Sequence, residues 1–162
     1  MKINKFVSTY FYGFLAASVL AACSTSVLAD SQEVKPAEIR TPICPQPRAT
    51  PQAPNKFLKM KNPLAPTDEN IEAGAKLFLG RLAPIPCKTC HGHLGNGLGD
   101  PDFESKPAPR NFTCAQTMSR IPDGQLFWVI KTGVPKTAMP TFDGLTDEEV
   151  WRLILHIRQL GK

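Results

Sequence analysis

The sequence predicts an all-α domain over residues 67–162, preceded by a proline-rich N-terminal extension. Two observations indicate helices in this part of the chain. Apolar residues recur at helical spacing in three segments, whereas few segments show the alternation typical of a strand. Capping residues stand before the first and the last of these segments, and a glycine follows the last.

The first predicted helix begins at Thr67 or Asp68, because either side chain can cap a helix. Asp68 and Glu69 then place negative charge at the positive end of the helix dipole. The apolar stripe that follows consists of Ile71, Gly74, Ala75, Leu77 and Phe78. Its central pair, Gly74 and Ala75, is small enough for a second helix to cross at short range.

Two more helices are predicted nearer the C-terminus. One spans about residues 123–131, and its apolar residues are Leu126, Phe127 and Ile130. The other starts with a capping box from Thr146 to Glu149 and stops at Gly161. Its apolar stripe consists of Val150, Trp151, Leu153, Ile154, Ile157 and Leu160.

Residues 1–22 are interpreted as a secretory signal peptide. Lys2 and Lys5 precede an apolar run over residues 6–22, which is the order of the charged and hydrophobic regions in such signals. A permanent membrane span is the alternative, since the run is almost long enough to cross a bilayer. The favoured interpretation predicts export to the periplasm.

Two cleavage sites compete in this region. Leu20-Ala21-Ala22-Cys23 resembles a bacterial lipobox, after which Cys23 would be lipidated and become the mature N-terminus. The residues up to Ala29 resemble an ordinary small-residue site, with cleavage after residue 29. We favour the lipobox, which predicts a lipoprotein held to a membrane through Cys23.

Residues 23–66 are interpreted as a tether between that anchor and the domain. The part from residue 31 onwards is polar and proline-rich, and proline supplies no N–H to a helix or a central strand. We therefore expect an extended, irregular segment and a folded domain from about Thr67. The formal net charge of +5 is not concentrated in a basic run, so nothing indicates nucleic-acid binding.

The segment Cys87-Lys88-Thr89-Cys90-His91 indicates the chemistry of the chain. Two thiols at this spacing can add to the two vinyl groups on one edge of a porphyrin, and the next residue then reaches the iron. A structural zinc site needs four ligands, and no second paired motif supplies them. A redox dithiol would follow a strand, which the prolines before Cys87 do not fit. The motif therefore predicts one covalent haem c, attached at Cys87 and Cys90 and ligated by His91.

Met139 is the candidate for the other axial ligand of the iron. It lies between the last two predicted helices, and Pro135 and Pro140 would stiffen the loop that holds a weak thioether–iron bond. Met118 stands in a polar stretch, where ordinary packing is the favoured role. Ligation by one histidine and one methionine is a known arrangement in cytochromes c.

The remaining cysteines predict a disulfide. The chain has five cysteines, and lipidation or cleavage at Cys23 and haem attachment at two others leave Cys44 and Cys114. An even remainder in an oxidising compartment favours a bridge between them. Two unpaired thiols are the alternative.

Three features together resemble a class I cytochrome c. They are Gly74-x-x-Leu77-Phe78, the run from Cys87 to His91, and Met139-Pro140 before a capped last helix. The resemblance covers about residues 71–160. Within it, the stretch from Pro122 to Pro140 resembles small bacterial periplasmic members. It implies three main helices around one haem, with the first and last packed near a right angle and with Gly74 and Phe78 against Trp151.

One departure from this family concerns residues 79–86, which lengthen the segment between Phe78 and Cys87. A bulged loop before the first haem cysteine is the expected consequence. Trp128, Arg110 and Asn111 are candidates to contact the haem propionates, although packing or surface placement is favoured for each.

The predicted function is electron transfer between redox proteins. With both axial positions of the iron filled, small substrates have no place to bind, so we expect an electron carrier and not an enzyme. The chain would act as a monomer or within a redox complex. Two alternatives are a haem-bearing subunit of a larger membrane redox enzyme and a gas-binding haem sensor in which Met139 is labile.

Overall fold

A computed structural model of the chain describes residues 40–47, 50–80 and 85–162. These described residues belong to one unit of the fold. The predicted signal peptide, the lipobox, Cys23 and the alternative cleavage site lie outside the described residues. No helix within the described ranges is long and apolar enough to cross a membrane.

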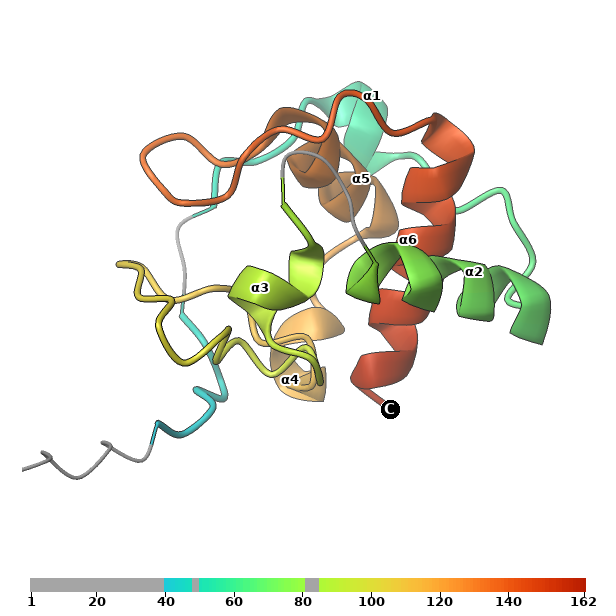
Figure 1. The fold of residues 1–162 in the computed structure, drawn as a ribbon. Helices are drawn as coiled ribbons and strands as arrows, with labels where there is room; N and C mark the ends of the chain where they lie inside the picture. Colours follow the sequence, from blue (N-terminus) through green and yellow to red (C-terminus); the bar gives the residue numbers. More distant parts are fainter. Residues whose placement is uncertain (1–39, 48–49, 81–84) are drawn as a thin grey trace, which may run out of the picture. The chain divides into compact units, whose positions relative to one another are not determined.

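The described part of the chain is helical and contains no strand, which confirms the all-α prediction. Its elements are α1 (Asn55–Leu58), α2 (Asp68–Leu79), α3 (Cys87–His91), α4 (Ala115–Met118), α5 (Asp123–Thr132) and α6 (Asp147–Leu160) (Figure 1). The three longest, α2, α5 and α6, are the three that the apolar patterns predict.

Helices α2 and α6 pack against each other, and in Figure 1 α2 runs across α6. A Cβ atom on Gly74 would lie 2.0 Å from the carbonyl oxygen of Arg152, so only glycine permits this approach. The close crossing expected at the small pair is therefore confirmed. The side chain of Phe78 is fully buried beside it, with its ring 5.3 Å from that of His156.

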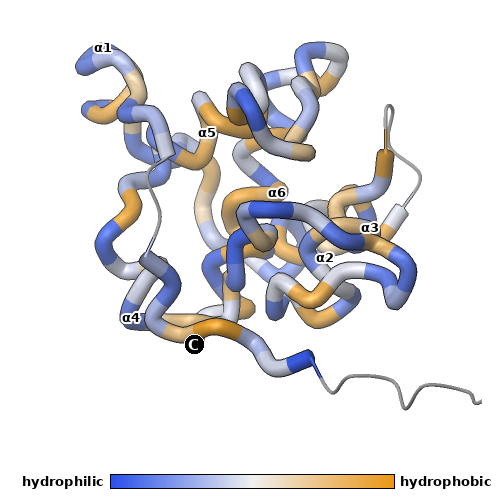
Figure 2. The backbone as a smooth tube through the Cα atoms, turned by 90° about the vertical axis from the view of Figure 1, so that its left-hand side faces the viewer, coloured by the Kyte–Doolittle hydropathy of each residue, from blue (hydrophilic) through white to orange (hydrophobic). Residues whose placement is uncertain are grey.

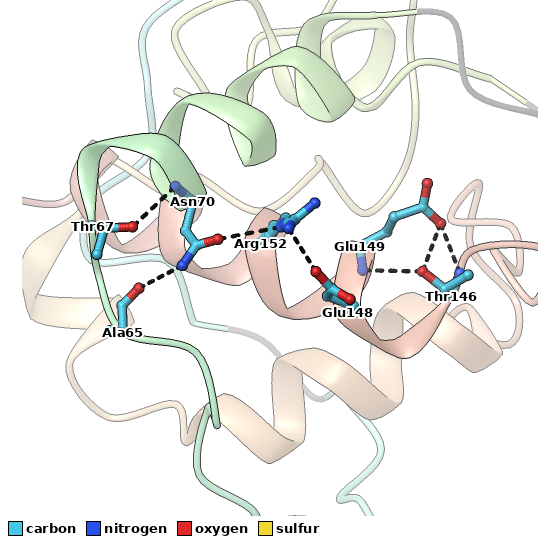
Figure 3. A network of polar contacts seen from close by, with 7 residues as sticks. All are labelled: Ala65, Thr67, Asn70, Thr146, Glu148, Glu149 and Arg152. Atoms are coloured by element: carbon cyan, nitrogen blue, oxygen red, sulfur yellow. Dashed lines mark hydrogen bonds and ion pairs between the residues drawn. The ribbon is translucent and has the colours of Figure 1, made fainter.

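Polar side chains fix the starts of both helices (Figure 3). The hydroxyl of Thr67 accepts a hydrogen bond from the backbone N–H of Asn70 at 3.3 Å. Thr146 and Glu149 form the predicted capping box, because each side chain also bonds the other's backbone N–H. Arg152 links the two helices, since its Nε donates to Asn70 Oδ1 at 3.3 Å.

The core lies among α2, α5 and α6. Figure 2 shows a hydrophobic run in α5 and alternating hydrophobic and hydrophilic residues around α6. The ring of Trp151 stacks on Phe127 of α5 with centroids 4.4 Å apart, while the backbone of the next residue meets Gly74. The largest fully buried side chains are Phe78, Leu153, Ile154, Val150 and Cys114.

The described residues of the predicted tether differ from an irregular linker, because they pack on the helices. A Cβ atom on Gly124 would lie 1.7 Å from the Phe57 carbonyl oxygen, which brings α1 directly onto α5. Asn62 Nδ2 donates to the Trp151 carbonyl at 2.9 Å, and Gln125 Nε2 donates to the Pro51 carbonyl at 3.0 Å. The Ala53 backbone N–H also donates to Gln125 Oε1 at 2.8 Å, so the side chain of Gln125 satisfies two backbone groups of the proline-rich segment.

Residues 79–86 are described only in part. Helix α2 ends at Leu79, residues 81–84 lie outside the described ranges, and Pro86 precedes α3. The expected bulged loop therefore stays a prediction.

Candidate functional site

A cavity of about 440 Å³ lies beside the C-terminal end of α3, and its volume is in the range typical of ligand pockets. Cys90, His91 and Met139 all line it, together with residues of α5. A smaller adjoining cavity is lined by the same three residues and by Cys87. The structure thus brings together at one site the four residues that the sequence assigns to haem binding.

Helix α3 presents the attachment motif. It begins after Pro86, whose fixed φ suits a helix start, and ends at Gly92, whose φ of 82° disfavours other residues. Cys87, Cys90 and His91 stand three and four residues apart, so they share one face of the helix. Both cysteines are free thiols in this structure.

The environment of the two thiols does not suit thiolate chemistry. Burial raises the pKa of the Cys87 thiol to about 12. The pKa of the Cys90 thiol is also raised, first by burial and then by the negative charge of Asp100. A reactive dithiol needs a lowered thiol pKa, so these surroundings argue against a redox dithiol. Among the described residues, no group of three or more His, Cys, Asp or Glu side chains could hold a metal ion, which argues against a zinc site.

The imidazole of His91 is oriented by the backbone. Its Nδ1 lies 3.0 Å from the carbonyl oxygen of Arg110, and His91 is only 9% exposed. Because a carbonyl oxygen can only accept, Nδ1 carries the proton and donates. This tautomer leaves the lone pair on Nε2, the form in which histidine binds a metal ion. The ring of Phe112 stacks on the imidazole, with centroids 4.5 Å apart.

Met139 lies on a braced loop between α5 and α6. The backbone N–H of Met139 donates to Thr137 Oγ1 at 3.1 Å, and its carbonyl oxygen accepts from the Val134 N–H at 3.2 Å. Gly133 ends α5 with a φ of 68°, and a Cβ there would lie 2.8 Å from the Met139 carbonyl oxygen. The loop is therefore fixed by hydrogen bonds and a required glycine as well as by its prolines.

The other residues weighed from the sequence have different roles. Met118 is 4% exposed and belongs to the hydrophobic core. Asn111 is buried and donates from Nδ2 to the Ile43 carbonyl at 3.1 Å, in line with a packing role. Arg110 lines the large cavity, and its Nη1 donates to the Gln46 carbonyl at 3.0 Å. Trp128 is half-buried on α5.

A disulfide joins Cys44 to Cys114, the two cysteines left over in the sequence, with their Cα atoms 5.6 Å apart. This Cα separation is typical of disulfides. Cys44 is exposed and Cys114 is buried at the start of α4. The bridge fastens the N-terminal segment to the part of the domain that carries Phe112 and Arg110.

Several residues at the site carry no signal in the sequence. The large cavity is also lined by three residues of the N-terminal segment, Thr50, Gln52 and Leu58. The sequence predicts a tether for this segment. Gln46 is only 9% exposed and bonds the loop that includes Arg110. One feature of the sequence does indicate that Gln46 lies near the domain. Gln46 stands two residues after Cys44, and a disulfide at Cys44 holds its neighbours against the domain.

The residues of this site fit a haem c. Two free thiols, an imidazole with its lone pair on Nε2 and a thioether share the two adjoining cavities. The lining of the cavities is largely apolar, as a porphyrin requires, and is supplied by Phe112, Leu126, Val129, Ile130 and Ile157 among others.

Comparisons with known proteins identify a family to which the chain is similar. Residues 69–157, more than half of the chain, match the family model described as cytochrome c oxidase, cbb3-type, subunit III. Comparison with curated proteins gave no significant match. One similar solved structure is a chain of the reducing HAO-like protein complex Kustc0457/Kustc0458 of Kuenenia stuttgartiensis, with 28% identity and a TM-score of 0.51.

The likeness to that structure is partial. It covers 65% of this chain and 49% of the other, so this chain spans about half the length of the one it matches. The family match, in contrast, contains the attachment motif, Met139 and most of α2 and α6. The chain therefore belongs to the c-type cytochrome family described as cytochrome c oxidase, cbb3-type, subunit III, and its cofactor is a covalently bound haem c.

Proposed function

We propose that this chain carries one electron at a time on a haem c whose iron is ligated by His91 and Met139. The observation that carries the proposal is the hydrogen bond from His91 Nδ1 to the Arg110 carbonyl at 3.0 Å, beside a cavity that Met139 also lines. A bound haem supplies an iron that alternates between Fe(II) and Fe(III). Two protein ligands would leave that iron no open position for a substrate.

Each of the four residues has a distinct role in this proposal. Cys87 and Cys90 hold the group covalently on one face of α3. His91, oriented through Nδ1, supplies Nε2 to the iron. Met139 supplies the thioether sulfur, which favours Fe(II) and raises the reduction potential.

The apolar lining supports the same role. Leu126, Val129 and Ile130 of α5 line the cavity with apolar side chains. Low polarity around a haem disfavours the more highly charged ferric form, so it also raises the reduction potential. Both effects raise the reduction potential, and the closed coordination of the iron suits an electron carrier.

The visible and near-infrared spectra of the holoprotein test this function. Ligation by Met139 predicts a methionine–iron charge-transfer band in the near infrared for the ferric protein. It also predicts a ferrous spectrum that carbon monoxide does not change. A missing band together with a shift on carbon monoxide would instead identify an open, gas-binding haem.

A second candidate function is that of a subunit within a larger redox complex. The family description names an oxidase subunit, and the similar solved chain comes from a protein complex and is about twice as long as the matched part. Purification from gently solubilised membranes separates the two cases. Stoichiometric co-purification with other redox proteins favours the subunit, and a solitary haem protein favours the free carrier.

We further propose export and anchoring through Cys23, on the basis of the sequence pattern. The mass of the mature holoprotein reports the cleavage site, the acyl chains and the haem in one measurement. Cys23→Ser is expected to move the protein from the membrane fraction to the soluble fraction of the periplasm. Equal membrane retention of this variant and the parent would contradict the anchor.

A further inference from the structure

We propose that Gln46, a residue of the N-terminal extension, is a positioning residue for His91. Its side-chain amide holds the backbone on both sides of Arg110 and thereby aims the Arg110 carbonyl at His91 Nδ1. The consequence is that the extension contributes to the reduction potential of the haem. This inference rests on the proposed ligation of the iron by His91.

The amide of Gln46 makes two short hydrogen bonds that bracket Arg110. Its Nε2 donates to the Pro109 carbonyl at 2.8 Å, and its Oε1 accepts from the Asn111 backbone N–H at 2.9 Å. Nε2 also approaches the Ala108 carbonyl at 3.4 Å. The carbonyl between the two bracketing groups is the one that faces His91 Nδ1 at 3.0 Å.

This loop needs such a partner because of its composition. Pro107 and Pro109 have no backbone N–H, so the loop cannot build a regular ladder of its own. Buried backbone groups are nevertheless almost always paired. The buried amide of Gln46 supplies both a donor and an acceptor at the spacing that an extended backbone segment offers.

Gln46 is itself held firmly. Its backbone N–H donates to Thr117 Oγ1 at 3.1 Å, and its carbonyl accepts from Arg110 Nη1 at 3.0 Å. The disulfide between Cys44 and Cys114 fastens the chain two residues earlier. The residue is 9% exposed, so water does not compete freely for its amide.

The orientation of the Arg110 carbonyl bears on the electron carried at the iron. A hydrogen bond from the second nitrogen of a metal-bound imidazole raises the basicity of the first nitrogen. A more basic ligand stabilises Fe(III) more than Fe(II) and lowers the reduction potential. If the hydrogen bonds of the Gln46 amide to Pro109 and Asn111 are lost, the hydrogen bond from His91 Nδ1 to the Arg110 carbonyl weakens. The reduction potential then rises.

The test compares Gln46→Met with Asn62→Ala in the full-length holoprotein. Gln46→Met keeps the volume of the side chain and removes its amide. Asn62→Ala also removes an amide that fastens the extension, but this amide bonds the Trp151 carbonyl of α6 at 2.9 Å and not the loop that includes Arg110. Redox titration gives the potential, and NMR of the ferric protein gives the hyperfine-shifted signals of the His91 ring.

We expect Gln46→Met to raise the reduction potential and to move the His91 ring signals, while the near-infrared methionine band is retained. Asn62→Ala is expected to lower thermal stability and to leave the potential and the ring signals at their parent values. If Gln46→Met yields no holoprotein, Gln46→Asn is used instead, because it keeps an amide that is one methylene too short to reach both Pro109 and Asn111. The same rise is expected.

A potential in the Gln46 variant that is unchanged or lower, with His91 signals like those of the parent, overturns the inference. Failure of the proposed function is distinguishable, because it appears in the parent protein as a missing methionine band. Failure of this inference appears only in the comparison of the variants with the parent.

Discussion

Gly74 meets the backbone of Arg152 so closely that a Cβ atom would lie 2.0 Å from the Arg152 carbonyl oxygen. Alanine favours a helix by about 1 kcal/mol over glycine, but this clash is with backbone, which cannot rotate away. Overpacking of this kind typically costs about 1–3 kcal/mol. We therefore expect Gly74→Ala to lower the free energy of unfolding of the holoprotein by about 2 kcal/mol.

Gly144→Ala is the matched control, because a Cβ at Gly144 meets nothing within 4 Å. This exchange is expected to leave stability unchanged or to raise it by about 0.5 kcal/mol. Denaturant unfolding of both variants, followed by circular dichroism, makes the comparison. Equal stability of the two variants would mean that α2 and α6 cross less closely at Gly74.

Met139→Leu tests the proposed thioether ligand. Leucine keeps an apolar side chain of similar size and removes the sulfur, so the near-infrared band is expected to disappear and the reduction potential to fall. The opened position should then bind carbon monoxide. Met118→Leu is the control, since Met118 is a buried core residue and the exchange conserves volume at a cost below about 1.5 kcal/mol. A band that survives in Met139→Leu would exclude Met139 as the ligand.

The long helices could be predicted from the sequence because each carries its own signals. The cap at Thr67 and the apolar stripe after it predict α2. The capping box at Thr146 predicts the start of α6 at Asp147. These signals lie within a few residues of one another, so no tertiary contact is needed to interpret them. The adjacent residues of the haem attachment motif could be assigned for the same reason.

The structure of the N-terminal extension could not be predicted. Helix α1 has four residues, too few for a periodic pattern, and its position depends on the close approach of Phe57 to Gly124. The hydrogen bonds of Gln46 join residues more than 60 positions apart. The predicted disulfide at Cys44 indicates that Gln46 lies near the domain, but a single glutamine in a proline-rich segment does not indicate which groups it bonds.

The capping box gives the stability of α6 a dependence on pH. Hydrogen bonds from the Thr146 backbone and side chain hold the pKa of the Glu149 carboxyl below its ordinary value of 4.5. A lowered carboxyl pKa stabilises the fold above that ordinary value, and the contribution is lost as the pH falls through the folded-state pKa. We expect Glu149→Gln, which can still accept the hydrogen bonds, to lose less stability on acidification than the parent.

Unfolding of the parent and of Glu149→Gln between pH 7 and pH 3 measures this difference. Thr146→Ala removes the cap itself and should cost about 1 kcal/mol at neutral pH. The two variants therefore separate the charge of Glu149 from the hydrogen bonds of the cap. Parallel acid profiles for Glu149→Gln and the parent would contradict the role of the charge.

The disulfide between Cys44 and Cys114 should contribute strongly to stability, because it closes a segment of the chain with a sequence separation of 70. Loop-closure entropy for a separation of this size corresponds to about 4 kcal/mol, and removal of such bridges usually costs about 2–5 kcal/mol. We expect the double variant Cys44→Ser with Cys114→Ser to lose stability in that range and to keep its haem, since the attachment cysteines lie elsewhere.

Mass spectrometry after alkylation, with and without reductant, checks the bridge directly. The parent should show two additional alkylatable thiols only after reduction, and these should map to Cys44 and Cys114. Partial proteolysis then separates two explanations of any lost stability. Cleavage confined to residues 40–47 in the double variant indicates release of the extension, because Cys44 is exposed while Cys114 lies inside the core. Cleavage throughout the domain would instead mean that a serine hydroxyl buried in place of the Cys114 sulfur disrupts the packing around α4, so that the bridge does more than fasten the extension.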